Sequence, residues 1–234
     1  MEISNQQEDL AQERSILNAT LKRRSFLQFA GAGVAGAALI AAGCKKDRSY
    51  ESSSAGVNLG SGDIGILNYA YALEQLEAAF YIQVVATPFT GMTADELIFL
   101  TDIRDHEIAH REFFKNALGN NAIPALEVNF STINFTSRTS VLGTAMAFED
   151  LGVTAYDGAG YLIKDANYLG LAGKIVSVEA RHAALIREMI SVNTFLGDQV
   201  DASSVNISRT PAQVLAIAGA YIKTKIDASN LPTS

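Results

Sequence analysis

The stretch Glu107-Ile108-Ala109-His110 is matched in spacing by Glu179-Ala180-Arg181-His182 further along the chain. In an α-helix, residues three positions apart share one face, so each Glu-x-x-His pair can present a carboxylate oxygen and an imidazole nitrogen to one cation. Random placement of the three histidines in this chain of 234 residues would produce only about 0.2 such pairs. Two pairs in long helical segments therefore indicate helices that share a cation site.

A lone glutamate precedes each pair on an earlier helical segment, Glu74 before the first and Glu149 before the second. A tyrosine follows each of them at the same interval, at Tyr81 and Tyr156. This internal match selects Glu74 over Glu77 as the counterpart of Glu149. The separation between glutamate and pair suits a helix, a short turn and an antiparallel helix that returns to the same level. The chain therefore contains two similar helical hairpins.

Four glutamates and two histidines make the ligand set of a carboxylate-bridged pair of metal ions in a four-helix bundle. The candidate metal ligands are Glu74, Glu107, His110, Glu149, Glu179 and His182. Carboxylates and imidazoles suit iron, manganese or zinc, and this mixed set suits a redox-active pair. Burial of four carboxylates without a cation would be very costly. We expect two iron ions, with manganese as the alternative.

The segment 73–81 and the two Glu-x-x-His pairs resemble the ferritin-like superfamily, and most closely the bacterial ferritin-like domain proteins related to plant desiccation-related proteins. The resemblance covers residues 63–195 and implies a rubrerythrin-like di-iron bundle. Its fold would be all-α, with two antiparallel helix pairs joined by a long crossover. The resemblance also implies that Glu107 and Glu179 bridge the two ions, while Glu74 with His110 and Glu149 with His182 complete each half.

Residues 1–44 have the features of an export signal. Arg23 and Arg24 precede an apolar run over residues 29–42, which is shorter than the stretch of about 20 residues that spans a membrane. Small residues lead directly to Cys44, the single cysteine, in a sequence that resembles a lipoprotein signal. We expect a twin-arginine-type lipoprotein that is exported to the cell envelope or periplasm and anchored to the lipid membrane through acylated Cys44.

The remaining chain divides by composition into a flexible tether over 45–62, the bundle over 63–195 and a C-terminal extension over 196–234. The net charge of −7 argues against nucleic acid as a partner. A homodimer is one possible assembly. No Cys-x-x-Cys pair follows the bundle, so catalytic turnover would need an external electron donor.

Five helices are expected, and their limits come from caps and breakers. Asp63 is a plausible cap for the first helix, and Thr93 with Glu96 forms a capping-box pattern for the second. A long crossover, partly extended over 128–135, occupies residues 119–137, and Pro211 begins the last helix. The expected helices are 63–86, 93–118, 138–157, 168–195 and 211–226.

Several neighbours of the candidate ligands allow two interpretations each. Glu77 is expected to be solvated, with a role as a seventh ligand or as a hydrogen-bond acceptor behind the ligands as the alternative. His106 is expected to have a surface or packing role. Asp150 is either an ordinary helix acid or a partner that orients a histidine. Arg181 either neutralises buried carboxylates or lies on the surface.

Tyr81 and Tyr156 are expected to fill the core, with a place beside the metal as the alternative. The site as a whole supports two hypotheses of function. One is a di-iron oxidoreductase that oxidises ferrous iron or reduces peroxide or oxygen in stress protection. The other is a non-catalytic envelope or desiccation-associated protein whose metal is structural or absent. An exchangeable coordination position and a route for small molecules would favour the first.

Overall fold

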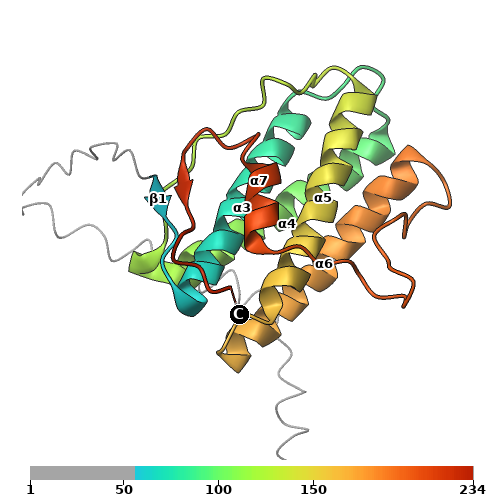
Figure 1. Ribbon diagram of the computed structural model, residues 1–234. Helices are drawn as coiled ribbons and strands as arrows, with labels where there is room; N and C mark the ends of the chain where they lie inside the picture. Colours follow the sequence, from blue (N-terminus) through green and yellow to red (C-terminus); the bar gives the residue numbers. More distant parts are fainter. Residues whose placement is uncertain (1–55, 234) are drawn as a thin grey trace, which may run out of the picture. The chain divides into compact units, whose positions relative to one another are not determined.

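Four long helices form the body of the protein. The structure is a computed structural model that describes residues 56–233, so the predicted export signal and Cys44 lie outside the described residues. The long helices are α3 (Gly62–Ala86), α4 (Ala94–Leu118), α5 (Arg138–Gly160) and α6 (Ala166–Ile190). Figure 1 shows them side by side, with the shorter α7 (Pro211–Ala218) against the bundle. The expected all-α four-helix bundle is confirmed.

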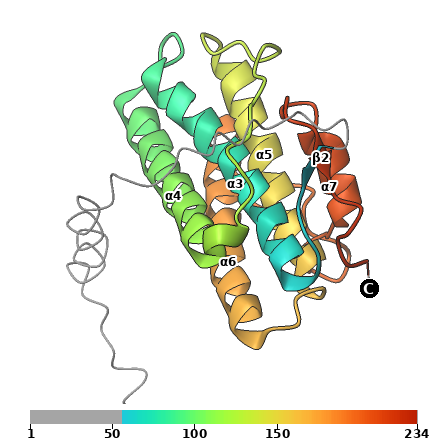
Figure 2. The same ribbon diagram turned by 90° about the vertical axis from the view of Figure 1, so that its left-hand side faces the viewer.

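The helices pack as two antiparallel pairs, α3 with α4 and α5 with α6. Short turns join the members of each pair, whereas a long crossover carries the chain from the end of α4 to the start of α5 (Figure 2). It begins with the 3₁₀ turn η1 (Gly119–Asn121). Within residues 56–233, no helix has the length and hydropathy needed to cross a membrane.

The crossover lies along α3 because two buried polar side chains of that helix bind its backbone. The Asn68 amide donates to Asn121 O and accepts from the Ile123 N–H. The side-chain carbonyl of Gln75 accepts a hydrogen bond from the Leu126 N–H at 2.8 Å. Further along, Phe130 and Phe135 pack against Phe80 of α3 with ring centroids 6.0 Å apart in both cases. With α4, α5 and the crossover around it, α3 has solvent on little of its surface, so polar residues along it are buried.

Side-chain caps begin four of the described helices, two of them at starts that the sequence indicated. Thr93 and Glu96 form a capping box on α4, and Thr210 forms another on α7 with Pro211 in the first turn. The expected cap at Asp63 is wrong, because Ser61 is the N-cap residue of α3. The Asp63 carboxylate instead accepts the backbone N–H groups of the two residues before α6, each at 2.8 Å, and so ties the two hairpins together.

Two helices end earlier than expected, and in each case backbone N–H groups beyond the helix have other hydrogen-bond partners. α6 stops at Ile190 rather than at residue 195, and the Glu188 carboxylate then accepts the N–H groups of Asn193 and Thr194. α7 stops at Ala218 rather than at residue 226. Beyond it, the Lys223 N–H bonds to the Glu127 carbonyl of the crossover at 2.7 Å.

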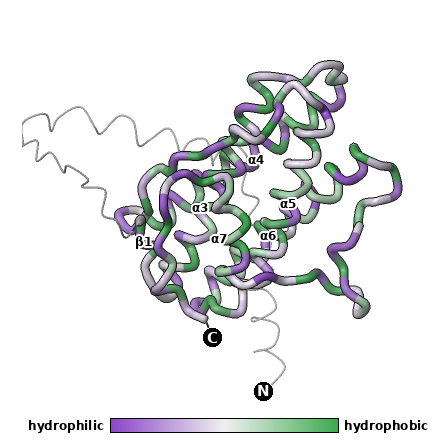
Figure 3. The backbone as a smooth tube through the Cα atoms, turned by 45° about the horizontal axis from the view of Figure 1, so that its top comes forward, coloured by the Kyte–Doolittle hydropathy of each residue, from purple (hydrophilic) through white to green (hydrophobic). Residues whose placement is uncertain are grey.

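The chain on either side of the bundle is partly ordered by a small parallel sheet. Strand β1 (Val57–Asn58) pairs with β2 (Ile226–Asp227), and the next residue, Leu59, is fully buried. The end of the expected tether is therefore part of the folded domain. By contrast, the segment between α6 and α7 extends away from the bundle (Figure 3). Several of its apolar side chains are exposed. These include Val192, Phe195, Leu196 and Val205.

Gly158 permits the close approach of α5 to the segment before α7. A Cβ atom at this position would lie 1.8 Å from the carbonyl oxygen of Arg209, which is backbone and cannot turn aside. We expect Gly158→Ala to lower the free energy of unfolding by about 1–3 kcal/mol. Gly143 of the same helix has open space around it, so Gly143→Ala should instead stabilise by about 0.5–1 kcal/mol. Urea unfolding of both variants tests this, and equal effects would contradict it.

Candidate metal centre

All six candidate ligands project into the middle of the bundle from its four helices. Helices α3 and α5 supply Glu74 and Glu149, and α4 and α6 supply the two Glu-x-x-His pairs. The four glutamates are fully buried and His182 is 4% exposed. The His110 side chain keeps 14% exposure, so it is the candidate ligand closest to solvent.

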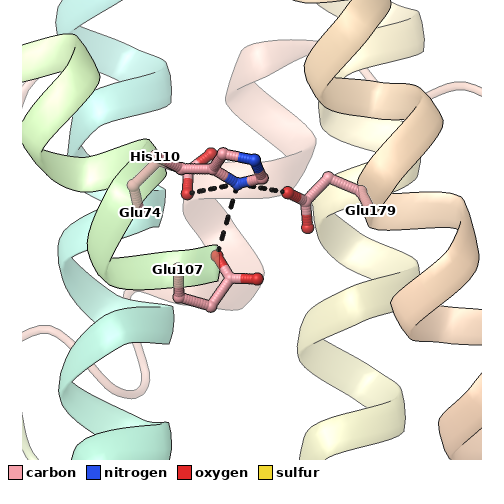
Figure 4. Close-up of side chains that lie close together, drawn as sticks. All are labelled: Glu74, Glu107, His110 and Glu179. Atoms are coloured by element: carbon pink, nitrogen blue, oxygen red, sulfur yellow. Dashed lines mark ion pairs between the residues drawn. The ribbon is translucent and has the colours of Figure 1, made fainter. Parts of the chain in front are cut away.

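The first half of the site surrounds Nδ1 of His110. This atom lies 2.8 Å from Glu179 Oε1, 3.5 Å from Glu74 Oε2 and 3.8 Å from Glu107 Oε2. Figure 4 shows the imidazole between these three carboxylates, which come from three different helices. Four donor atoms therefore converge on one point.

The second half has the same design around Nδ1 of His182. This atom lies 2.9 Å from Glu107 Oε1, 3.4 Å from Glu149 Oε2 and 3.9 Å from Glu179 Oε2. Glu107 and Glu179 therefore belong to both halves, and each directs one oxygen to either side. In each half the donor atoms lie within 4.8 Å of one another.

The donor atoms lack hydrogen bonds in spite of these short distances. Among residues 56–233, eight buried atoms of the six candidate ligands have no hydrogen-bond partner: Glu74 Oε2, both oxygens of Glu107, His110 Nδ1, Glu149 Oε2, both oxygens of Glu179 and His182 Nδ1. Buried polar atoms without partners are rare and costly. The set divides into two groups of three carboxylate oxygens and one imidazole nitrogen, which is a donor set that fits iron, manganese or zinc. The cluster could hold a metal pair.

Two tyrosines bind Glu74 and Glu149, the carboxylates that each belong to only one half of the site. The Tyr81 hydroxyl of α3 donates to Glu149 Oε1 on α5, and the Tyr156 hydroxyl of α5 donates to Glu74 Oε1 on α3. Each glutamate thereby has one oxygen bonded and the other directed into the site. The tyrosines are buried in the core as expected, and they also contact the candidate ligands. Their matched position after each glutamate was the sequence signal for this role.

In the metal-free cluster, burial and the two imidazole rings shift the pKa values of the carboxyl groups. Burial raises the pKa of Glu74 to about 7 and that of Glu179 well above its ordinary value. Burial also opposes ionisation of Glu107, but the adjacent His110 and His182 rings lower its pKa to about 2. Although burial disfavours the charged form of His182, Glu107 and Glu149 raise its pKa to about 11. Without metal, these shifts favour protonated rings beside Glu107 and neutral forms of the carboxyl groups whose pKa is raised.

Glu77 lies inside the bundle, so the expectation of a solvated side chain is wrong. It is 4% exposed, and burial together with four neighbouring carboxylates raises its pKa well above the ordinary value. A Cβ atom at Gly152 would lie 3.1 Å from Glu77 Oε1 and 3.6 Å from Glu179 Oε2. Glu77 is thus a fifth carboxylate beside the cluster. Its spacing of three residues from Glu74 was a signal that it shares the inward face.

The other neighbours have definite partners. His106 is exposed, yet its Nδ1 lies 2.9 Å from His182 Nε2, so it does more than occupy the surface. Asp150 does not orient a histidine, because its carboxylate binds the Arg187 guanidinium. Arg181 lies on the surface, which excludes the alternative that it neutralises the buried carboxylates.

Comparison with known proteins adds one finding. The model of a family described as a ferritin-like domain matches residues 62–192, a range that begins with α3 and ends just after α6. No curated protein matches the chain.

Removal of one phenol should destabilise the cluster. Tyr81→Phe leaves the buried Glu149 Oε1 without its donor, so we expect the free energy of unfolding to fall by about 1–3 kcal/mol. Tyr161→Phe is the matched control because Tyr161 is 66% exposed. Urea unfolding of the metal-free variants measures both effects, and a Tyr81 variant as stable as the control would show that this bond contributes nothing.

Metal binding should release protons. Because a ligating Nδ1 must be unprotonated while the pKa of His182 is raised to about 11, binding at pH 7 displaces at least one proton. Lower pH should therefore weaken metal binding. Calorimetric titration with anaerobic ferrous iron in two buffers of different ionisation enthalpy measures the release, and identical heats in both buffers would contradict it.

Proposed function

Since this chain belongs to the ferritin-like domain family, we propose that its bundle holds a carboxylate-bridged pair of iron ions, with manganese as the alternative metal. The observation that carries the proposal is the set of eight buried donor atoms without hydrogen bonds. In this proposal, Glu107 and Glu179 would be shared by both ions, because each carboxylate directs one oxygen to either half. The other four candidate ligands complete the two halves.

We further propose that the centre oxidises ferrous iron or reduces dioxygen or peroxide. A pair of bound ferrous ions would supply the two electrons that reduce dioxygen to the level of peroxide, or peroxide to water. Four protein donor atoms for each ion are fewer than the six of an octahedral site, which leaves positions for a small molecule. This supports a reactive centre over a coordinatively filled one.

An apolar cavity supports access by a small, uncharged substrate. It measures about 20 Å³, which is room for about one small molecule, and side chains from all four long helices line it. Leu73, next to Glu74 in the chain, and Tyr156, which binds Glu74, are part of this lining. Dioxygen, being small and apolar, suits such a cavity better than a charged substrate does.

The residues around the centre have distinct roles in this proposal. Tyr81 and Tyr156 orient Glu149 and Glu74 and stand close enough to pass a proton to these carboxylates. Burial of the glutamates excludes bulk water from the centre. His110, the least buried of the candidate ligands, marks the side facing solvent. Turnover would need an external electron donor.

The place of action remains a prediction from the sequence. We propose that export and acylation at Cys44 anchor the bundle at the cell envelope, where it would protect against oxidative or desiccation stress. Mass spectrometry of the membrane fraction from the native host tests this part separately, because an unmodified cysteine in a cytoplasmic chain would exclude it.

Metal content is the decisive measurement for the centre. We expect elemental analysis of the full chain, loaded anaerobically with ferrous iron, to give about two iron ions per chain. The double variant His110→Ala, His182→Ala should lose them, whereas Asp102→Asn, at an exposed position on α4, should keep them. A folded parent that binds no iron or manganese would refute the metal centre.

Reactivity is tested on the same loaded protein. We expect addition of dioxygen or hydrogen peroxide to convert ferrous to ferric iron faster than in buffer, and the double variant to lose this acceleration. Two tightly held ions that react with neither oxidant would refute the oxidoreductase function and leave the structural or desiccation-associated role.

A further inference from the structure

His106 is not one of the proposed ligands, but it directly contacts His182, which is one of them. It precedes Glu107 on α4, and its ring faces His182 of α6 across the bundle. The two rings are nearly parallel, with an interplanar angle of 14° and centroids 5.1 Å apart. His106 Nδ1 lies 2.9 Å from His182 Nε2, a normal hydrogen-bond distance.

The nitrogen of His182 that faces the candidate ligands determines which of the two rings donates this hydrogen bond. His182 directs its Nδ1 toward the carboxylates, so a metal ion would bind at that atom. A neutral imidazole that binds metal through one nitrogen carries its proton on the other. His182 Nε2 is then the donor, and His106 Nδ1 is the acceptor. His106 consequently carries its own proton on Nε2.

The opposite half of the site has no such partner. The position before Glu179 that corresponds to His106 is Val178, whose side chain cannot accept a hydrogen bond. The ion-pair contacts of His110 with other described residues all involve its Nδ1 and the carboxylates of the cluster. The two halves therefore share one set of candidate ligands and differ in what supports their histidines.

We propose that His106 is a positioning residue that holds His182 in the orientation and tautomer that bind metal, and thereby makes the two metal positions unequal. The inference rests on the proposed metal pair and adds to it. A hydrogen bond to the distal nitrogen fixes the ring of a metal-bound histidine and raises its basicity, and its loss typically weakens metal affinity about 10–100-fold. The ion on the His182 side is thus the more tightly held of the two.

Two substitutions separate the acceptor from the ring. His106→Phe keeps an aromatic ring against His182 and removes the acceptor. His106→Asn removes the ring and can place its amide oxygen near the position of Nδ1. Because His106 is exposed on α4, both variants should fold, and circular dichroism of each checks this.

The readouts are metal affinity and a direct view of the hydrogen bond. Anaerobic titration of the full chain with ferrous iron against a competing chelator gives the two binding constants. We expect His106→Phe to weaken the tighter one by about 10–100-fold and the weaker one little, while His106→Asn stays within a few-fold of the parent. Nuclear magnetic resonance of the metal-free parent should show a nitrogen–nitrogen coupling between His182 Nε2 and His106 Nδ1, which His106→Phe abolishes.

The possible results separate this inference from the proposed function. Two ions in the parent and unchanged affinities in His106→Phe would overturn the role of His106 and leave the metal centre intact. Equal weakening in both variants would also overturn it, because ring packing rather than the acceptor would then be responsible. A folded parent that binds no metal would overturn the metal centre and this role together.

Discussion

The burial of four carboxylates around two imidazole rings is the constraint on which the rest of the structure depends. Glu74, Glu107, Glu149 and Glu179 have no exposure to solvent, and an ionised carboxylate in such surroundings is stable only beside a cation. In the metal-free cluster, the raised pKa of both histidines favours their cationic form, and two metal ions would supply more positive charge. Every helix of the bundle contributes to this balance, so the bundle and its centre form as one unit.

The surrounding fold keeps the cluster dry and fixed. α3 carries two of the buried acids and is covered by α4, α5 and the crossover, whose backbone is held by Asn68 and Gln75. The tyrosines then fix the two carboxylates that belong to one half only. Each of these contacts joins segments that are far apart in the sequence. The loss of one of these contacts would therefore change the positions of the donor atoms.

The sequence predicted the parts of this site that local periodicity encodes. The spacing of Glu107 and His110 specifies one helix face, and the repeat at Glu179 and His182 specifies a second, so the four-helix bundle could be inferred. The contacts that could not be inferred lie between helices. The hydrogen bond from His182 to His106 depends on how α4 faces α6, and the burial of Glu77 depends on how closely α5 places Gly152 against α3. The early end of α7 likewise involves a backbone group that binds the distant crossover, whereas the chain after α6 is bound locally by Glu188.

Each hairpin supplies the tyrosine that binds the glutamate of the other hairpin, and this reciprocity shows how the bundle is organised. Tyr81 serves the glutamate of the second hairpin and Tyr156 serves that of the first, which is the reciprocal contact of an isologous, twofold-symmetric interface. The bundle is therefore organised as a dimer of hairpins within a single polypeptide, with the shared carboxylates of Glu107 and Glu179 at its pseudo-axis. Because the two hairpins are parts of one chain, they can differ in sequence, and the symmetry is broken where His106 of one hairpin corresponds to Val178 of the other.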